Sequence, residues 1–303
     1  MKKPVVGGQA VIEGVMMRNA NQMAMAVRQP DGEIVVEQKE INSLSTKYTM
    51  FKLPILRGML ALAEAMYYGM RSLSTSAQLS GSEEEELSDK EMAVTMIGAV
   101  LFAVCLFIVI PTFAVKYMRE YINNIMLLNV AEGLLRLAIF LSYVFAISKF
   151  GDIRRVFQYH GAEHKTIHAY EADEPLDVEH IQKHTTLHPR CGTSFLLIVM
   201  LVSMCIFAFM GWPSLWQRIL ARILLMPLVA GISYEIIRYA GRHAQAGFMQ
   251  WLIVPGLMLQ KLTTREPDAS QIEVAIEALK TVLQTNSETQ VYGQTDENIE
   301  FIQ

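Results

Sequence analysis

An uncharged apolar run from Met92 to Val115 is the feature that most constrains the fold of this chain. It holds about two dozen residues, and roughly 20 are enough to cross the hydrocarbon core of a bilayer as a helix. It begins far from the N-terminus, and the first residues lack an apolar core, so it does not resemble a signal peptide. The run therefore predicts a transmembrane helix.

Three further stretches predict membrane spans: 125–147, 193–210 and 219–237. The first contains Glu132 and Arg136, which share a helix face at i,i+4 spacing and can neutralise each other. The last contains Glu235, for which two readings stay open. An acid inside a membrane marks a functional site by default, but this one can also lie at the interface or pair with Arg238.

Two other apolar blocks are too short or too mixed to span. Residues 51–73 carry four charges among apolar residues and predict an amphipathic helix that lies on the membrane or packs on the bundle. Residues 248–259 contain Pro255 and Gly256, and they predict a re-entrant or interfacial segment.

The overall composition agrees with a membrane protein and excludes several other classes. Of the 303 residues 52% are hydrophobic and 18% charged, with a mean hydropathy of +0.26. A net charge of −4 gives no basic field of the kind that nucleic-acid-binding proteins use, so no nucleic-acid partner is expected. Three cysteines are too few for a disulfide framework.

Basic residues gather in the loop after the second predicted span, which orients the chain with that loop and both termini in the cytoplasm. These residues are Lys149, Arg154, Arg155, Lys165, Lys183 and Arg190. In a bacterium this orientation predicts a multi-pass protein of the inner membrane, whose first partner is the lipid bilayer.

We therefore predict a mainly α-helical membrane protein with about four transmembrane helices, a small N-terminal β-hairpin region and cytosolic helices. The hairpin joins residues 23–27 and 33–37 across a Pro-Asp-Gly turn. A capping box at Ser270 and Glu273 predicts the start of a C-terminal helix. The predicted organisation is a β region at 1–48, an amphipathic helix and acidic linker at 49–91, a membrane domain at 92–260 with a histidine-rich cytosolic loop at 149–192, a cytosolic helix at 261–285 and a disordered tail at 286–303.

Six of the seven histidines lie in that cytosolic loop, which makes it the main functional signal. If residues 153–172 are helical, His160 and His164 share one face and can bind a single metal ion. Glu163 lies one residue off that line, close enough to act on a water molecule as a general base. This is the H-x-x-E-H order of inverted zinc metallopeptidases, although such a short pattern supports metal binding better than it supports a peptidase.

Further candidate ligands come from other parts of the sequence. His188 and Cys191 form a second suitable pair just before the third predicted span, while Glu235 and Glu171 are candidate carboxylate ligands. A mixed set of histidine, cysteine and carboxylate suits a divalent metal ion, zinc in the first place, with iron or manganese as alternatives. Cys191 can alternatively be a capping thiol near the interface.

Four stretches carry a family resemblance: GGQAVIEGVMMR at 7–18, HGAEHKTIHAYE at 160–171, HPRCGTSFL at 188–196 and LTTREPD at 262–268. With these motifs the chain resembles the bacterial YqhQ-like family of integral membrane proteins, described as predicted metal-dependent enzymes of unknown function. The resemblance covers nearly the whole chain. It implies an inner-membrane protein with a metal site at His160, Glu163, His164 and His188, and it implies no substrate.

The leading functional expectation is a membrane-embedded, metal-dependent hydrolase that acts on a membrane-associated ester, phosphoester or peptide at the cytosolic interface. One alternative is a non-catalytic membrane scaffold or regulator, with a structural zinc ion or none. Another is a small-solute or metal transporter, for which four spans would suffice in a homodimer, although the chain has few intramembrane charges.

Overall fold

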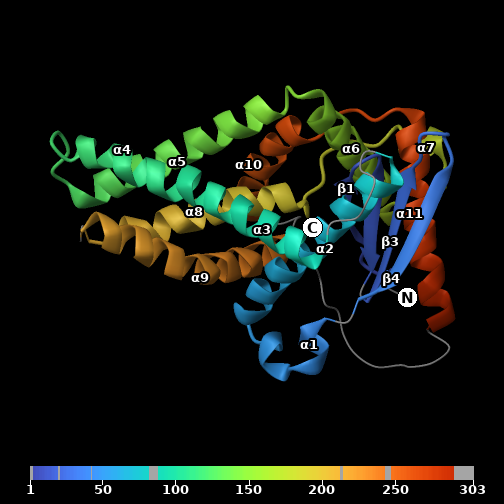
Figure 1. Cartoon of the computed structure of the whole chain (residues 1–303), viewed down its shortest axis with the longest axis horizontal. Helices are drawn as coiled ribbons and strands as arrows, with labels where there is room; N and C mark the ends of the chain where they lie inside the picture. Colours follow the sequence, from blue (N-terminus) through green and yellow to red (C-terminus); the bar gives the residue numbers. More distant parts are fainter. Residues whose placement is uncertain are drawn as a thin grey trace.

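The computed structural model describes residues 3–19, 21–41, 43–81, 88–211, 214–242 and 247–289. It is mainly helical, with one small antiparallel sheet formed by the N-terminal residues. Long helices form a bundle, and the sheet lies beside one end of this bundle with α6 and α11 packed against it (Figure 1). The predicted class, a mainly helical protein with a small N-terminal β region, is confirmed.

The sheet has the order β1-β2-β3-β4, with every neighbouring pair antiparallel. Its strands are β1 (Gly7–Val11), β2 (Gly14–Asn19), β3 (Gln22–Arg28) and β4 (Ile34–Glu40). The predicted hairpin corresponds to β3 and β4, where Gly32 has a φ of 93° that favours glycine. β1 and β2 extend this hairpin to four strands through a second tight hairpin.

The β1–β2 turn is fixed to α6 (Gly151–Glu171) by an acidic side chain. Glu13 occupies the turn with a positive φ of 52° and forms a bidentate ion pair with Arg155. The hydroxyl of Tyr159 donates to the same carboxylate at 3.2 Å. These contacts hold the start of the sheet against the helix that carries the histidine cluster.

One face of the sheet is covered by α6 and α11 (Ala269–Thr289), and the main hydrophobic core lies between them. Its fully buried side chains come from all three layers: Met17 from the sheet, Tyr159 and Ile167 from α6, Ile272 and Leu279 from α11. The N-terminal sheet and the last described helix therefore form one packed unit with α6. The short helix α7 (Val178–Ile181) contributes the buried Ile181.

Three helices are long and apolar enough to cross a membrane: 89–118, 125–147 and 215–240. The first is continuous through α3 (Asp89–Val104), a π-helical turn η2 (Cys105–Val109) and α4 (Ile110–Met118); the others are α5 (Ile125–Ile147) and α9 (Leu215–Arg242). Large apolar side chains of α3 such as Ile97, Leu101 and Phe102 are exposed. A surface of this kind needs a non-aqueous environment, so these helices indicate a membrane protein.

The third predicted span differs from the other three. Residues 193–210 form α8 (Gly192–Ala208), an apolar helix of 17 residues that falls below the length of the three candidate spans. At 1.5 Å per residue it extends about 25 Å, a little short of a hydrocarbon core of about 30 Å. The predicted count of four spans is therefore not confirmed by helix length. α8 packs against α5, α9 and α10 inside the bundle.

A buried charge cluster lies within the bundle, at the end far from the sheet. The predicted pairing of Glu132 with Arg136 is present, with a separation of 3.6 Å between Oε1 and Nη2. Arg218 and Arg222 of α9 also reach Glu132. All four side chains are less than a tenth exposed.

Four shorter predictions are corrected or refined by the structure. The amphipathic stretch 51–73 falls at the end of η1 (Thr49–Lys52) and within a longer helix, α2 (Leu56–Leu79), while a short helix α1 (Leu44–Lys47) precedes it. The segment proposed as re-entrant is one continuous helix, α10 (Gly247–Thr263), with Pro255 inside it. The box that caps α11 uses Asp268 and Gln271 in place of Ser270 and Glu273, because the helix begins one residue before Ser270. α11 runs to Thr289, beyond the predicted 285, whereas the acidic linker 83–86 and the tail from 290 on lie outside the described residues.

Candidate metal centre

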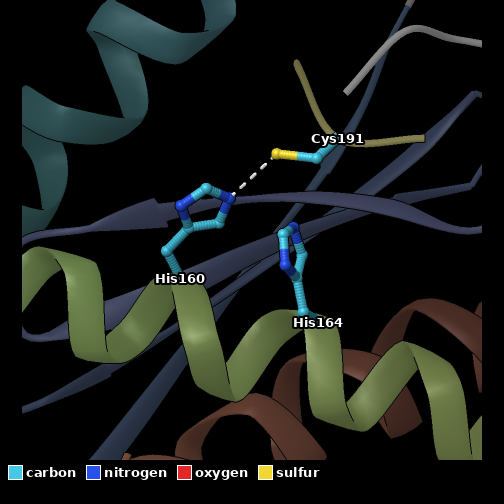
Figure 2. A group of neighbouring side chains, drawn as sticks. All are labelled: His160, His164 and Cys191. Carbon is cyan, nitrogen blue, oxygen red and sulfur yellow. Dashed lines mark hydrogen bonds between the residues drawn. The ribbon is translucent and has the colours of Figure 1, made fainter. Parts of the chain in front are cut away.

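α6 confirms the predicted helix and places His160 and His164 one turn apart on a single face (Figure 2). Their ring centroids are 4.4 Å apart. Gly161, between them, faces the segment before α11 so closely that a Cβ there would overlap the carbonyl oxygen of Arg265. This close approach brings backbone carbonyl groups beside the imidazole rings.

Backbone carbonyls fix the tautomer of both histidines. Nδ1 of His160 lies 2.9 Å from the carbonyl oxygen of Thr263, and Nδ1 of His164 lies 2.6 Å from that of Thr186. A carbonyl oxygen can only accept, so each Nδ1 carries the hydrogen and each neutral ring presents an Nε2 lone pair. Metal-binding histidines in proteins are oriented by this kind of hydrogen bond.

Cys191 completes a three-residue group with the two histidines. It precedes α8 as its N-cap, and its buried thiol faces the α6 imidazoles (Figure 2). Sγ lies 3.2 Å from Nε2 of His160, and all three ligand atoms lie within 4.8 Å of one another. The structure thus brings together three of the candidate ligands identified from the sequence, His160, His164 and Cys191.

Protonation states in this group also suit a metal ion. Burial lowers the pKa of His164, which keeps its ring neutral. Burial alone would raise the pKa of the Cys191 thiol, but interaction with the neighbouring His164 and hydrogen bonding with Thr193 outweigh it, so the pKa is lowered. Neutral imidazoles and a thiolate are the forms that bind zinc.

Glu163 lies at the edge of the same group, with Oε2 4.0 Å from Nε2 of His160. It is 1% exposed, and its Oε1 has no hydrogen-bond partner among the described residues. Burial raises the pKa of this carboxyl to about 8, while attraction to His160 acts in the opposite direction. A divalent cation at the three ligands would act against burial, lower this pKa and favour the carboxylate.

His188 and Glu171 do not join this first group but form a second one with His168. Nε2 of His188 lies 3.6 Å from Oε2 of Glu171, which also pairs with Arg190. Nε2 of His168 donates to the carbonyl of Leu187. His188 is buried, and burial lowers its pKa to about 4.

Glu235 is not brought to either histidine group. Its carboxylate pairs with Arg57 of α2, and it also accepts a hydrogen bond from the backbone N–H of Ile55 at 3.4 Å. Of the two readings left open by the sequence, the structure favours an ion pair, although the main partner is Arg57 and not Arg238.

A cavity of about 310 Å³ opens beside the first group. His160, Glu163, His164 and Cys191 lie on one side of it, β1 on another, and small or apolar residues of α2 on a third. A structural zinc site is normally closed by four protein ligands, whereas a catalytic site keeps one position for water or substrate. Three ligands beside a cavity match the second arrangement.

Comparison with known sequences places the chain in a family. The family described as "Protein of unknown function (DUF1385)" matches residues 53–285. The chain belongs to this family. The uncharacterized protein YqhQ of Bacillus subtilis (strain 168) is 36% identical over 298 residues, which cover 92% of each chain. No solved structure matches this chain. The family match contains the whole of the first ligand group, whereas β1 to β4 lie before it.

Several parts of the site carry no signal in the sequence. Thr186 and Thr263 orient the two histidines through their backbone carbonyl groups, so the identity of their side chains does not indicate this role. Gln260 of α10 accepts from the backbone N–H of His188 and donates to its carbonyl, at 2.8 and 2.7 Å. Only its position within a mostly apolar segment marks it as unusual.

Proposed function

We propose that this protein is a zinc-dependent hydrolase whose site lies at the cytosolic face of the bacterial inner membrane. The observation that carries the proposal is the convergence of two oriented Nε2 lone pairs and one thiol beside a cavity, with a buried carboxyl next to them. His160, His164 and Cys191 would hold the ion. His188, Glu171 and Glu235 would not.

Different residues of this chain have different roles in the proposed reaction. A zinc ion supplies Lewis-acid chemistry that makes water a nucleophile near neutral pH. Thr263 and Thr186 hold the imidazoles in the binding tautomer through their carbonyls. Glu163 is placed to accept a proton from the attacking water and return it to the leaving group, because one of its oxygens has no other partner among the described residues.

The packing of the chain ends supports four membrane crossings with both described ends on the cytosolic side. The N-terminal sheet contacts α11, so an even number of crossings must separate them. Three long helices give an odd number, and α8 supplies the fourth. The end of α4, the start of α5, the end of α8 and the start of α9 lie together at the end of the bundle far from the sheet, as four crossings require (Figure 1).

Metal analysis of the full-length protein, purified in detergent without a histidine tag, tests the site. We expect about one zinc ion per chain, and its loss in His160→Ala, His164→Ala and Cys191→Ser. His184→Ala is the matched control, since this partly exposed histidine pairs with Glu174 and should leave the metal content unchanged. Wild-type protein without stoichiometric metal would refute the proposal.

A second measurement separates catalysis from a structural role. Glu163→Gln should retain zinc and abolish the cellular phenotype that wild-type protein restores to a deletion strain. X-ray absorption of the bound zinc should show three protein ligands and one lighter, exchangeable ligand. Four protein ligands, together with full function of Glu163→Gln, would favour the scaffold alternative.

A further inference from the structure

β1 is an edge strand, and its free edge lies at the proposed catalytic site. Within the described sheet, β1 pairs with β2 on one side only. Residues 7–10 of this strand line the cavity that also contains the zinc ligands and Glu163. An edge strand presents unpaired N–H and C=O groups at regular spacing.

The register shows which backbone groups face the cavity side. Val11 and Gly14 close a two-residue hairpin, so Val11, Gln9 and Gly7 direct their N–H and C=O groups toward β2. Alternation then turns those of Gly8, Ala10 and Ile12 outward. Ile12 confirms the direction, because its N–H donates to Ser76 of α2 at 3.1 Å. No hydrogen-bond partner of the outward groups of Gly8 and Ala10 occurs in the described part of the chain.

Gly8 brings this edge into contact with Glu163. A Cβ on Gly8 would lie 2.9 Å from Cγ of Glu163, so only glycine lets the strand come this close to the carboxyl. Ala61, Ala65 and Tyr68 of α2 line the cavity opposite. The cavity thus combines a polar backbone edge, a mainly apolar wall and a hydrolytic group at one end.

We propose that the substrate is a peptide, bound in extended form as an additional strand along the free edge of β1. A strand that adds to a sheet edge matches donors and acceptors at this spacing, whereas an ester of a lipid has no such repeating pattern. The inference rests on the proposed function. The oxygen of water would bond to the amide carbonyl carbon, the C–N bond would break, and the proton accepted by Glu163 would go to the leaving nitrogen. The second proton of the water would follow to the same nitrogen, giving a carboxylate and an ammonium group.

Binding of hydroxamates to the zinc-loaded protein tests the metal site and the peptide-binding edge separately. Acetohydroxamic acid probes the metal alone, acetyl-trialanine hydroxamate adds a backbone, and the analogue methylated on its central amide nitrogen removes one donor. The added backbone hydrogen bonds predict a tripeptide affinity at least roughly tenfold above that of acetohydroxamic acid. The N-methylated analogue should lose most of this gain.

The outcomes are distinguishable. If acetohydroxamic acid does not bind, the metal site itself is refuted, and the peptide inference with it. If it binds but the tripeptide gains nothing, or if N-methylation makes no difference, the peptide inference alone is overturned.

A variant of β1 provides the complementary test. Ala10→Pro removes an outward N–H that makes no bond to β2, at an edge position where proline is tolerated. It should weaken binding of the tripeptide hydroxamate several-fold and leave acetohydroxamic acid unchanged, while the control Ala10→Ser keeps the N–H and the affinity. Unchanged tripeptide binding in Ala10→Pro would contradict the proposal. Weaker binding of both hydroxamates would indicate that the variant is misfolded, and the comparison with the N-methylated analogue on wild-type protein would then decide.

Discussion

Gly161 lies at the tightest contact near the metal centre and offers a test at the scale of one residue. Its hydrogen faces the carbonyl of Arg265, and a methyl group would overlap that oxygen. Gly161→Ala should therefore push the segment before α11 away from α6 and destabilise the protein by about 1–3 kcal/mol or more. Thermal unfolding in detergent, followed by intrinsic fluorescence, would measure a lower Tm.

The same helix contains a matched control. Gly151, at the start of α6, has open space where a methyl group would lie, with nothing within 4 Å of that position. Gly151→Ala should leave the Tm unchanged or slightly raised, because alanine favours a helix. A Gly161→Ala variant as stable as Gly151→Ala would mean that the two segments do not pack as closely as described.

At this scale the sequence predicted only what helical spacing determines. His160, Glu163 and His164 share one helix, so their proximity follows from their positions. His188 and Cys191 are only three residues apart, yet the turn between them directs the first toward His168 and the second toward His160. No periodicity governs such a turn, so the choice between them as ligands was beyond sequence reasoning.

At the scale of an element, the start of α11 tests which residue caps the helix. The carboxylate of Asp268 accepts from the N–H of Gln271 at 3.0 Å and from the hydroxyl of Ser270 at 2.6 Å. Asp268→Ala should cost about 1 kcal/mol of stability, and Ser270→Ala clearly less. Thermal unfolding of both variants would decide, and the opposite order would restore the cap that the sequence predicts.

The same cap has a defined pH dependence. Partial burial would raise the pKa of Asp268, but hydrogen bonds from Ser270 and from the backbone N–H of Gln271 outweigh it and lower the pKa below 3.8. Its contribution is therefore complete above the ordinary pKa and is lost as the pH falls through the lowered one. The Tm difference between wild type and Asp268→Asn should shrink as the pH is lowered from about 5 toward 3, and a constant difference would argue against the carboxylate as the cause.

At the scale of the whole molecule, hydropathy located the apolar segments well but not their relation to the polar parts. The sequence grouped the N-terminal strands and the C-terminal helix as separate regions, because nothing local links residues so far apart along the chain. The structure joins them: Arg28 of β3 donates to the carbonyl of Ser270 at 2.7 Å and pairs with Glu273 of α11. This contact supports the proposed even number of membrane crossings.

The proposed four crossings predict the sides on which exposed residues lie. Single cysteines introduced at Tyr121, in the α4–α5 connection, and at Lys183, near α7, are suitable reporters because both positions are exposed. Each variant is expressed in a form of the protein without the native cysteines. In spheroplasts, a membrane-impermeant maleimide should label Tyr121→Cys directly and Lys183→Cys only after permeabilisation. Labelling of both positions in intact spheroplasts would rule out the topology.

The buried charge cluster shows how the far end of the bundle is held together. Glu132 of α5 forms ion pairs with Arg218, at 2.5 Å, and with Arg222, so its carboxylate links α5 to α9. The hydroxyl of Thr112 in α4 donates to the same carboxylate at 2.7 Å. Glu132→Gln would leave buried guanidinium groups facing a neutral amide. Removing one partner of a buried ion pair typically costs roughly 3–5 kcal/mol, because the remaining charge stays desolvated.

We therefore expect Glu132→Gln to lower the Tm strongly, whereas Glu120→Gln, an exposed acid at the same end of the molecule, should have little effect. Glu132 and its partners Arg218 and Arg222 lie near the starts of α5 and α9, and both helices start at the end of the bundle far from the sheet (Figure 1). The Glu132→Gln protein that remains folded should therefore still bind zinc. Equal Tm values for the two variants would show that the cluster does not stabilise the bundle. Loss of zinc from folded Glu132→Gln protein would instead show that the two ends are coupled. α8 offers a route for such coupling, since Arg136 donates to its Ser203 and Cys191 is its N-cap.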